Sequence, residues 1–403
     1  MDARRRPSGD VIGGATWRAE RREGLGDRVD HLRVALTGGG TGGHLFPALA
    51  IGRALRVRCP HGVILFLGSA GGRERAAVER EGWDFVGLTV RAVTGVGPAR
   101  AAAALGLIAL AAWEARRILQ RFGADVVVGT GAYVSAPVVL AARSLGVAAL
   151  LHEQNAHPGL ANRLLASWAR PAAVAVGMAA AARFFRRCRV EITGNPIRQE
   201  VLGADRVAAR AALGIAPDSV VPLVFGGSQG AHRVNMALME ALPLLGAERE
   251  RLHVIHATGD RDLEAVREGY ATLGFRATVS PFIREMGAAY AAADFAICRA
   301  GAITLAELAA MGVPALLVPY PFAANDHQRL NAEAFTRAEA AQVLADRELT
   351  GERVAAFIRW ACRDPQVLRE MGRRARSMAV PDAAERIAAL VAAIAPRARR
   401  AGG

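Results

Sequence analysis

The sequence has no lysine, few cysteines and few aromatic residues, and each shortage narrows what the protein can be. All 51 basic residues are arginine against 37 acidic residues, a formal net charge of +14. Such an excess suits a phosphate group on a soluble ligand or at a membrane, although arginine in place of lysine is also typical of a GC-rich genome. The cysteines stand far apart without a C-x-x-C pair, at Cys59, Cys188, Cys298 and Cys362. This spacing excludes a structural zinc site of the usual kind and gives no disulfide framework, so a reducing cytoplasm fits best.

Long apolar runs are also missing. Charged residues interrupt every apolar stretch before the ~18 residues that a membrane-spanning helix needs. Hydrophobic residues make up 52% of the 403 residues, which excludes disorder for the bulk of the chain. At roughly 100–200 residues per domain, this length indicates two domains. Residues 1–31 mix charges and glycine without the apolar core of a secretory signal, and we expect a disordered extension there.

Two glycine-rich loops organise the rest of the chain. One strand runs into GGGTGGH (38–44) and then a helix, and a second strand runs into GGSQGAH (226–232) and another helix. Each unit aims backbone N–H groups at a phosphate. Around them, short apolar strands alternate with alanine-rich helical runs. The pattern predicts an α/β fold with two doubly wound Rossmann-like domains that face each other across a cleft.

The domain boundaries fall where this alternation is interrupted. A Gly-Asn-Pro sequence at 194–196 separates two periodic segments. We therefore expect a first domain over residues 32–195 and a second over residues 196–376. We also expect the final helix, 383–394, to pack back on the first domain.

Polar side chains follow the predicted strands of the first half, where open α/β sheets bind their ligands. His44 begins a helix after the first loop, a suitable position for a general base. Glu153, in the run from His152 to Asn155, is the alternative base, and Tyr133 follows a neighbouring strand as a third candidate catalytic residue. The non-catalytic interpretation of the run is a hydrogen-bonded loop that fixes the next segment.

The second half predicts a helix N-terminus suited to a diphosphate. The helix begins near Ala302, and its free N–H groups and dipole favour an anion. Glu307, beyond the first turn, then accepts hydrogen bonds from ribose hydroxyls, or is simply an acid favoured by the dipole. Further polar side chains follow the next strand, at Asn325, Asp326, His327, Gln328 and Asn331. Asp260 and Asp262 form a D-x-D without a supporting acid, which we interpret as a turn and not as a metal site.

The first loop also keeps a nicotinamide cofactor open. Gly38, Gly40 and Gly43 satisfy G-x-G-x-x-G, a weak signal for a dinucleotide. Such a site needs an acid at the end of the second strand to hold the ribose. We identify no acid that closes that strand, although Arg73 could accept a 2′-phosphate.

Five motifs carry a resemblance to a known family: GGTGGH, HEQN, GNPIR, GGSQGA and RAGAITLAE, in this order within residues 32–396. They resemble the MurG family of bacterial glycosyltransferases. The resemblance implies a GT-B fold and inverting transfer of GlcNAc from UDP-GlcNAc to the 4-hydroxyl of MurNAc in undecaprenyl-diphospho-MurNAc-pentapeptide (lipid I), a step of peptidoglycan synthesis. It implies no metal, no other cofactor and no nucleic-acid partner. It also implies peripheral attachment to the cytoplasmic face of the inner cell membrane.

The resemblance further implies donor contacts at matching positions. Ile283 would act through its backbone on uracil, and Gln328 through its amide on sugar hydroxyls. The implied UDP-GlcNAc contacts are Gly42, Gly43, His44, Asn155, Arg198, Ser228, Ile283, Ala302, Ile303, Thr304, Leu305, Ala306, Glu307 and Gln328. His327 stands where some relatives have glutamine.

The membrane prediction centres on a run of thirteen uncharged residues, Ala101–Trp113, with arginines on both sides. An apolar face that contains Leu107, Ile108 and Trp113 suits the headgroup boundary of an anionic membrane. A buried helix of the first domain is the alternative. Three other functions stay open on the sequence: a UDP-GlcNAc 2-epimerase, a nicotinamide-dependent oxidoreductase and a non-catalytic protein that binds a lipid carrier.

Overall fold

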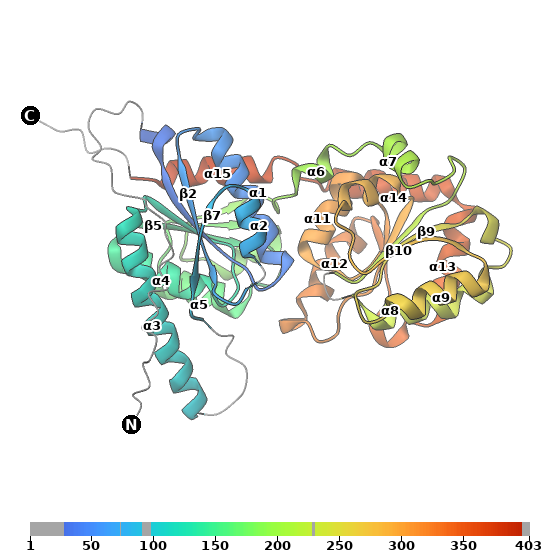
Figure 1. Ribbon diagram of the computed structural model, residues 1–403, viewed down its shortest axis with the longest axis horizontal. Coiled ribbons are helices and arrows are strands. Elements are labelled where there is room, and N and C mark those ends of the chain that lie inside the picture. The colour runs from blue at the N-terminus through green and yellow to red at the C-terminus, as the bar shows by residue number, and fades with distance from the viewer. Residues whose placement is uncertain (1–27, 73, 91–97, 228–229, 397–403) are drawn as a thin grey trace, which may run out of the picture.

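The computed structural model of the protein describes residues 28–72, 74–90, 98–227 and 230–396, which form two α/β domains next to each other (Figure 1). Of the predicted disordered extension, residues 1–27 lie outside the described residues. Arg28–His31 instead form a short 3₁₀ helix, η1, so the prediction is wrong for these four residues. The His31 ring stacks on the His61 ring at 5.1 Å, which holds η1 against the domain.

Within the described residues, the first domain has a seven-stranded parallel sheet. Its strands are β1 (Arg33–Thr37), β2 (Val63–Ser69), β3 (Asp84–Leu88), β4 (Val126–Gly129), β5 (Ala148–Glu153), β6 (Ala173–Val176) and β7 (Val190–Ile192). In space their order is β3-β2-β1-β4-β5-β6-β7, so the order reverses between β1 and β4. Ligands of doubly wound sheets bind at such a reversal, beyond the carboxyl ends of the strands.

Helices cover both faces of this sheet, which is why its strands are continuous apolar runs. The helices are α1 (Gly42–Arg58), α2 (Arg75–Arg80), α3 (Pro98–Phe122), α4 (Ser135–Leu145), α5 (Leu160–Trp168) and the 3₁₀ helix η2 (Ala179–Phe184). Side chains of α3, α4 and α5 form the core on one face, and those of α1 and α2 form the core on the other.

The second domain repeats the plan with a parallel sheet in the order β10-β9-β8-β11-β12-β13. Its strands are β8 (Pro222–Phe225), β9 (His253–Ala257), β10 (Arg276–Ser280), β11 (Phe295–Cys298), β12 (Ala315–Leu317) and β13 (Ala341–Val343). Its helices are α6 (Gln199–Leu202), α7 (Arg206–Ala212), α8 (His232–Ala241), α9 (Leu263–Leu273), α10 (Met286–Ala292), α11 (Ala302–Met311), α12 (His327–Arg337), α13 (Gly351–Arg363) and α14 (Pro365–Ser377). Short 3₁₀ helices lie between them: η3 (Leu242–Leu245), η4 (Arg249–Arg251), η5 (Ala324–Asp326) and η6 (Asp346–Glu348).

The chain passes from one domain to the other after β7 and returns after α14, and the two crossings touch. A Cβ on Gly194 would lie 2.6 Å from Cβ of Val380, and the φ of Gly194 is +79°, so this position requires glycine. After the return, α15 (Ala383–Ile394) packs against α1, with Ile387 and Val391 in the first domain's core. Figure 1 shows α15 beside α1 and β2.

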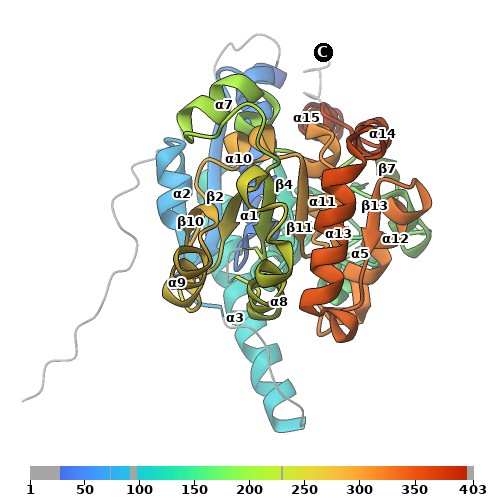
Figure 2. The same cartoon turned by 90° about the vertical axis from the view of Figure 1, so that its right-hand side faces the viewer.

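Helix α3 extends out of the first domain, and Figure 2 shows its projecting end pointing away from α7 and α14. Among the described residues, no helix has both the length and the apolar character needed to cross a bilayer.

Candidate active site

His44 lies in the first turn of α1, beyond the carboxyl end of β1. Its Nδ1 is 2.8 Å from the carbonyl oxygen of Thr130, the residue that follows β4. Because a carbonyl can only accept, Nδ1 donates and Nε2 keeps its lone pair. The Thr130 hydroxyl in turn donates to the carbonyl oxygen of His44 at 2.8 Å. These two bonds fix the start of α1 against the end of β4, at the point where the strand order reverses.

The surroundings of His44 favour an uncharged ring. Burial lowers the pKa of His44 below its ordinary value of 6.5, and the hydrogen bond to Thr130 and the charge of Glu153 oppose only part of this effect. His327, from the second domain, lowers this pKa further. Gly131 packs against the ring, since a Cβ there would lie 2.9 Å from Nδ1 of His44. A neutral imidazole with a free lone pair is the form that a general base needs.

Glu153 has its carboxylate fully engaged within its own loop. Its Oε1 accepts from the backbone N–H of Asn155 at 2.9 Å and from that residue's Nδ2 at 3.2 Å. Its Oε2 accepts from Gly159 N–H at 3.2 Å and from Nδ2 of Asn162 at 2.9 Å. The side chain is buried. The geometry therefore favours a carboxylate that orders residues 153–162 over one that receives a proton from substrate.

Tyr133 and His152 flank these groups. Tyr133 is partly buried beside the first glycine-rich loop, where a Cβ on Gly40 would lie 3.6 Å from its Cε1. His152 is fully buried, and this burial lowers its pKa to about 3. Gln154 donates to Nδ1 of His152 at 3.1 Å and to the carbonyl oxygen of Thr130 at 2.7 Å. His152 is thus an uncharged structural group behind the loop that holds His44.

Asn155, after β5, and Asn331, within α12, join the two domains. Nδ2 of Asn331 donates to Oδ1 of Asn155 at 3.1 Å and to the carbonyl oxygen of Ala300 at 3.2 Å. Oδ1 of Asn331 accepts from the backbone N–H of Ala156 at 2.8 Å. Asn331 is fully buried, so both ends of its amide are used in holding the domains together.

Arg198 and Glu307 form a buried ion pair where the chain enters the second domain. Nε of Arg198 donates to Oε1 of Glu307 at 2.8 Å, and the Tyr290 hydroxyl donates to Oε2 of Glu307 at 3.0 Å. The guanidinium also lies 4.7 Å from the centre of the Phe46 ring, in α1 of the first domain. Burial alone would lower the pKa of Arg198, but the charge of Glu307 raises it, so the guanidinium stays charged. The pair connects both domains to α11.

Helix α11 begins at Ala302, as the sequence predicts, and its amino end lies beside this ion pair. Thr304 and Ala306 are partly exposed there, whereas Ala302, Ile303 and Leu305 are buried. The buried residues can therefore offer a ligand only their backbone N–H groups. Gly42 and Gly43 start α1 in the same way in the first domain. Ile283 lies elsewhere, partly buried in the loop that follows the edge strand β10.

Gln328, in α12, forms hydrogen bonds with the segments that follow two neighbouring strands. Its Oε1 accepts from the backbone N–H of Ala300, after β11, at 3.1 Å and from that of Tyr320, after β12, at 2.9 Å. Asn325 and Asp326, directly before α12, have φ angles of +53° and +52°, the left-handed region that non-glycine residues seldom adopt. His327 therefore starts α12 from a constrained turn that faces the first domain.

The second glycine-rich loop is described only in part, and the predicted contact Ser228 lies outside the described residues. At its end, Nδ1 of His232 is 2.8 Å from Oδ1 of Asp262, and Nδ2 of Asn235 donates to Oδ2 of Asp262 at 2.8 Å. The second acid of the D-x-D is thus buried in a polar network while Asp260 is exposed. Over the residues that the structure describes, no group of three or more His, Cys, Asp or Glu side chains is arranged to hold a metal ion.

Sequence reasoning missed Glu74 and the tertiary partners of the loops. No acid closes the second strand, since β2 ends at Ser69, but Glu74 folds back from the segment after β2 and its Oε1 accepts from Ser69 N–H at 2.8 Å. A Cβ on Gly39 would lie 2.7 Å from that oxygen. Glu74 is buried, and its carboxylate packs against Gly39 and Gly72, so it supports the first loop. Its spacing after a Gly-Gly turn was the only available signal. Arg73, the other candidate there, lies outside the described residues.

Comparison with known proteins gives the class of this fold and site. The N-terminal domain model of glycosyltransferase family 28 matches residues 34–174, and the C-terminal domain model of the same family matches residues 221–387. Two doubly wound domains with these matches define a glycosyltransferase of the GT-B fold. A UDP-N-acetylglucosamine 2-epimerase structure from Listeria monocytogenes, 13% identical with a TM-score of 0.67, shares the fold alone.

Relatives narrow the class to one family. The UDP-N-acetylglucosamine–N-acetylmuramyl-(pentapeptide) pyrophosphoryl-undecaprenol N-acetylglucosamine transferase of Citrifermentans bemidjiense is 42% identical over 356 residues, 88% of this chain and 98% of the relative. That of Syntrophotalea carbinolica is 42% identical over 357 residues. The crystal structure of Acinetobacter baumannii MurG has a TM-score of 0.70 and 29% identity, and the match covers 90% of this chain and 99% of that one. The chain belongs to this family, the MurG glycosyltransferases.

Proposed function

We propose that this protein transfers GlcNAc from UDP-GlcNAc to the 4-hydroxyl of MurNAc in undecaprenyl-diphospho-MurNAc-pentapeptide, with inversion at the anomeric carbon. The observation that carries the proposal is identity of about 40% to transferases of this name across nearly their whole length, with 98% of the first relative covered. The two facing sets of strand-end residues agree with a reaction between a donor and an acceptor. The product is the lipid-linked disaccharide used in peptidoglycan synthesis.

In this proposal a residue of the first domain accepts the proton of the acceptor hydroxyl. The attacking hydroxyl must lose its proton as it bonds to C1 of the donor sugar. Nε2 of His44 has a free lone pair because Nδ1 is bonded to Thr130, and burial keeps the ring neutral. Glu153 already accepts four hydrogen bonds, two on each oxygen. We therefore assign the general base to His44, with Glu153 as the residue that orders the neighbouring loop.

The second domain binds the donor. The free N–H groups at the start of α11 suit the diphosphate, and Arg198 is held by its ion pair with Glu307 of the same helix. Glu307 has one partner on each oxygen, and each oxygen retains a lone pair for a ribose hydroxyl. Oε1 of Gln328 is bonded to two backbone N–H groups, which leaves the amide nitrogen for sugar hydroxyls.

Release of UDP tests this assignment directly. Purified protein is incubated with UDP-GlcNAc, with and without a soluble analogue of lipid I, and UDP and the disaccharide product are measured. UDP release that requires the analogue, with one disaccharide per UDP, supports the transferase. UDP release or formation of a 2-epimer without the analogue contradicts it, as does oxidation of a nicotinamide cofactor.

We also propose that the protein attaches peripherally to the cytoplasmic face of the membrane through an apolar surface of the first domain. Leu107, Leu110 and Trp113 of α3 are exposed, and Leu160 and Trp168 of α5 are also exposed. Both helices pack against α4, so they belong to one helical layer (Figure 1). Ile108, named from the sequence, is less exposed than Leu110. Arg117 lies 4.8 Å from the Trp113 ring centre and adds positive charge at the edge of this surface.

Flotation with vesicles containing phosphatidylglycerol tests the attachment. Replacement of Leu107, Leu110 and Trp113 by serine should abolish flotation, whereas serine at the exposed Val57 and Val207, away from this surface, should leave it intact. Salt should weaken but not abolish binding of the native protein, because each arginine contributes only about 1 kcal/mol. Unchanged flotation of the folded triple variant assigns attachment to another surface.

A further inference from the structure

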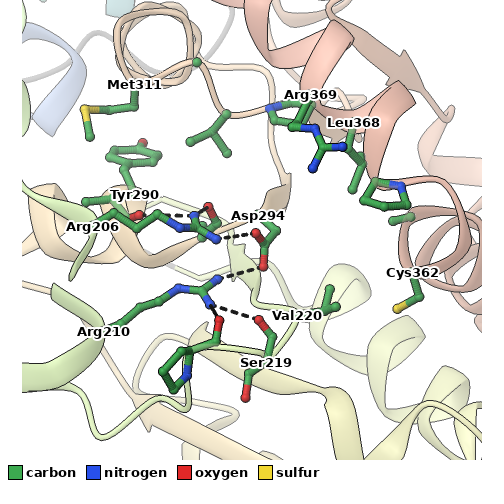
Figure 3. A pocket seen from close by; sticks show the side chains of 18 of the residues that line it. Arg206, Arg210, Ser219, Val220, Tyr290, Asp294, Met311, Cys362, Leu368 and Arg369 are labelled. Carbon is green, nitrogen blue, oxygen red and sulfur yellow. Dashed lines mark hydrogen bonds and ion pairs between the residues drawn. The ribbon is translucent and has the colours of Figure 1, made fainter.

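A cavity of about 580 Å³ lies at the amino ends of the strands of the second sheet, the end opposite to the candidate active site (Figure 3). Ser219 and Val220 precede β8 at this cavity, and Asp294 precedes β11. The donor side lies beyond the carboxyl ends of the strands, whereas this cavity lies at their amino ends. Helix α11 spans the distance, since it begins at the donor side and Met311, its last residue, lines the cavity.

The floor of the cavity is a fixed network built on one carboxylate. Oδ1 of Asp294 accepts from Arg206 at 2.5 Å, and Oδ2 accepts from Arg210 at 2.8 Å and from Val221 N–H at 2.7 Å. Arg210 is buried and also donates to the carbonyl oxygen of Ser219 at 3.0 Å. Figure 3 shows both guanidinium groups converging on Asp294. One aspartate is thus shared by two arginines, and a positive charge remains in the floor.

The rim adds more positive charge. Arg251, Arg369 and Arg376 line the cavity and are exposed. Across the residues that the structure describes, Arg251 and Arg369 form no ion pair, and Arg376 donates to the carbonyl oxygen of Met311 and not to a carboxylate. Asp218 and Asp294 are the acidic residues of the lining, against five arginines. A concave site with three more guanidinium groups than carboxylates attracts anions.

We propose that this cavity binds a small, soluble phosphate ester whose phosphate is held by Arg251 and Arg369. The planar fork of arginine matches two phosphate oxygens at once, which lysine does not achieve. Leu368 and Val313 line the same cavity and offer apolar contact to the organic part of the ligand. Figure 3 shows Leu368 and Arg369 on one side and the Arg206–Arg210–Asp294 network on the other.

The position of the cavity favours a soluble ligand over a lipid headgroup. It is bordered by α7 and α14, and in both Figure 1 and Figure 2 these helices lie at the end of the molecule opposite to the projecting end of α3. A bilayer in contact with α3 and α5 would therefore lie away from the cavity. Tyr290 lines the cavity and also donates its hydroxyl to Glu307, so one residue belongs to both sites.

Isothermal titration with inorganic pyrophosphate tests the proposal. UDP is present at saturation, so that the amino end of α11 is occupied. The double variant Arg251→Ala/Arg369→Ala should bind pyrophosphate roughly tenfold or more weakly than the native protein. The control Arg58→Ala/Arg353→Ala removes the same charge from exposed arginines outside the cavity and should bind like the native protein.

The outcomes separate the two sources of phosphate. Equal pyrophosphate affinity in both double variants overturns the proposal, as does absence of binding to the native protein. Flotation with phosphatidylglycerol vesicles is measured on the same variants. Loss of flotation in Arg251→Ala/Arg369→Ala with unchanged pyrophosphate affinity would assign these arginines to a lipid headgroup and overturn a soluble ligand. Thermal unfolding of each variant confirms that the replaced surface side chains leave the fold intact.

Discussion

The two glycine-rich loops have the same backbone arrangement, but the histidines at their ends have different hydrogen-bond partners. Each follows a central strand, β1 or β8, and each ends with a histidine in the first turn of a helix, His44 or His232. Nδ1 of His44 lies 2.8 Å from the carbonyl oxygen of Thr130. Nδ1 of His232 lies 2.8 Å from a carboxylate oxygen of Asp262. The equivalent atoms of the two rings therefore have a neutral partner in one domain and an anionic partner in the other.

The partners determine what each histidine can do. Asp262 is bound by Asn235, whose Oδ1 lies 3.1 Å from Nε2 of the buried His256, so His232 ends a polar network inside the second domain. His44 is desolvated at the domain junction, and its pKa is lowered by that burial. The glycine-rich loop thus precedes the first turn of the helix, and a residue far along the chain is the hydrogen-bond partner that determines the role of the histidine. Thr130 is 86 residues from His44, and Asp262 is 30 residues from His232.

Replacement of the two histidines should give the largest contrast. His44→Ala should lower kcat about 10²–10⁴-fold, since a general base contributes that factor, with little change in the KM for UDP-GlcNAc. His232→Ala should change kcat far less, because its ring is held in a structural pair with Asp262. Steady-state UDP release in the presence of a lipid I analogue measures both. Equal losses in the two variants would refute the assigned difference, and a large loss in Glu153→Gln alone would move the base to Glu153.

Displacement of His44 without its removal should have the next largest effect. A Cβ on Gly131 would lie 2.9 Å from Nδ1 and Cε1 of His44, so Gly131→Ala should move the ring and lower kcat on the order of 10²-fold. Gly131 has a φ of +100° and Gly146 a φ of +70°, so alanine strains the backbone at both positions.

Gly146→Ala is the matched control, because a Cβ at Gly146 meets nothing within 4 Å. Both variants should lose thermal stability, and only Gly131→Ala should lose activity beyond that. Equal activity in the two variants would mean that the position of the His44 ring does not limit the reaction.

In the second domain the expected change is in binding and not in turnover. Glu307→Gln keeps the shape of the side chain but removes the charge that pairs with Arg198, and it weakens acceptance from ribose hydroxyls. The KM for UDP-GlcNAc should rise about tenfold, with kcat much less affected. Asp294→Asn is the control, since it alters another arginine–carboxylate pair of the same domain, at the amino ends of the strands. A fall in kcat with unchanged KM in Glu307→Gln would contradict its role in donor binding.

The sequence predicts the plan of the molecule better than its site contacts. The two glycine-rich loops, the doubly wound fold and the start of α11 at Ala302 are local patterns of periodicity and turn residues, and the fold prediction is confirmed. The predicted disorder of residues 1–31 is wrong for residues 28–31, because the His31–His61 stacking is not visible in local composition.

Partners at large sequence separation could not be predicted. The distance between Ala156 N and Oδ1 of Asn331 is 2.8 Å across 175 residues, and the Arg198–Glu307 pair spans 109 residues. No periodicity links such positions, since they meet only when the two domains do. The same limit hid Glu74, whose carboxylate reaches the first loop only after β2 pairs with β1. The roles of the named site residues therefore stay predictions that the variants above test.

The smallest effect is expected in the pH dependence of the native protein. A base must be unprotonated, so activity falls as pH drops through the pKa of His44. Burial lowers this pKa below 6.5, which places the acid limb of kcat/KM below pH 6.5. Between pH 7.5 and 6.5 kcat/KM should then fall less than about twofold, because at least half of the rings stay neutral. In His44→Ala this limb should vanish from the residual activity, while His232→Ala should keep it unchanged. A native limb centred above pH 6.5, or a limb that survives in His44→Ala and is lost in His232→Ala, would reverse the roles of the two loop histidines.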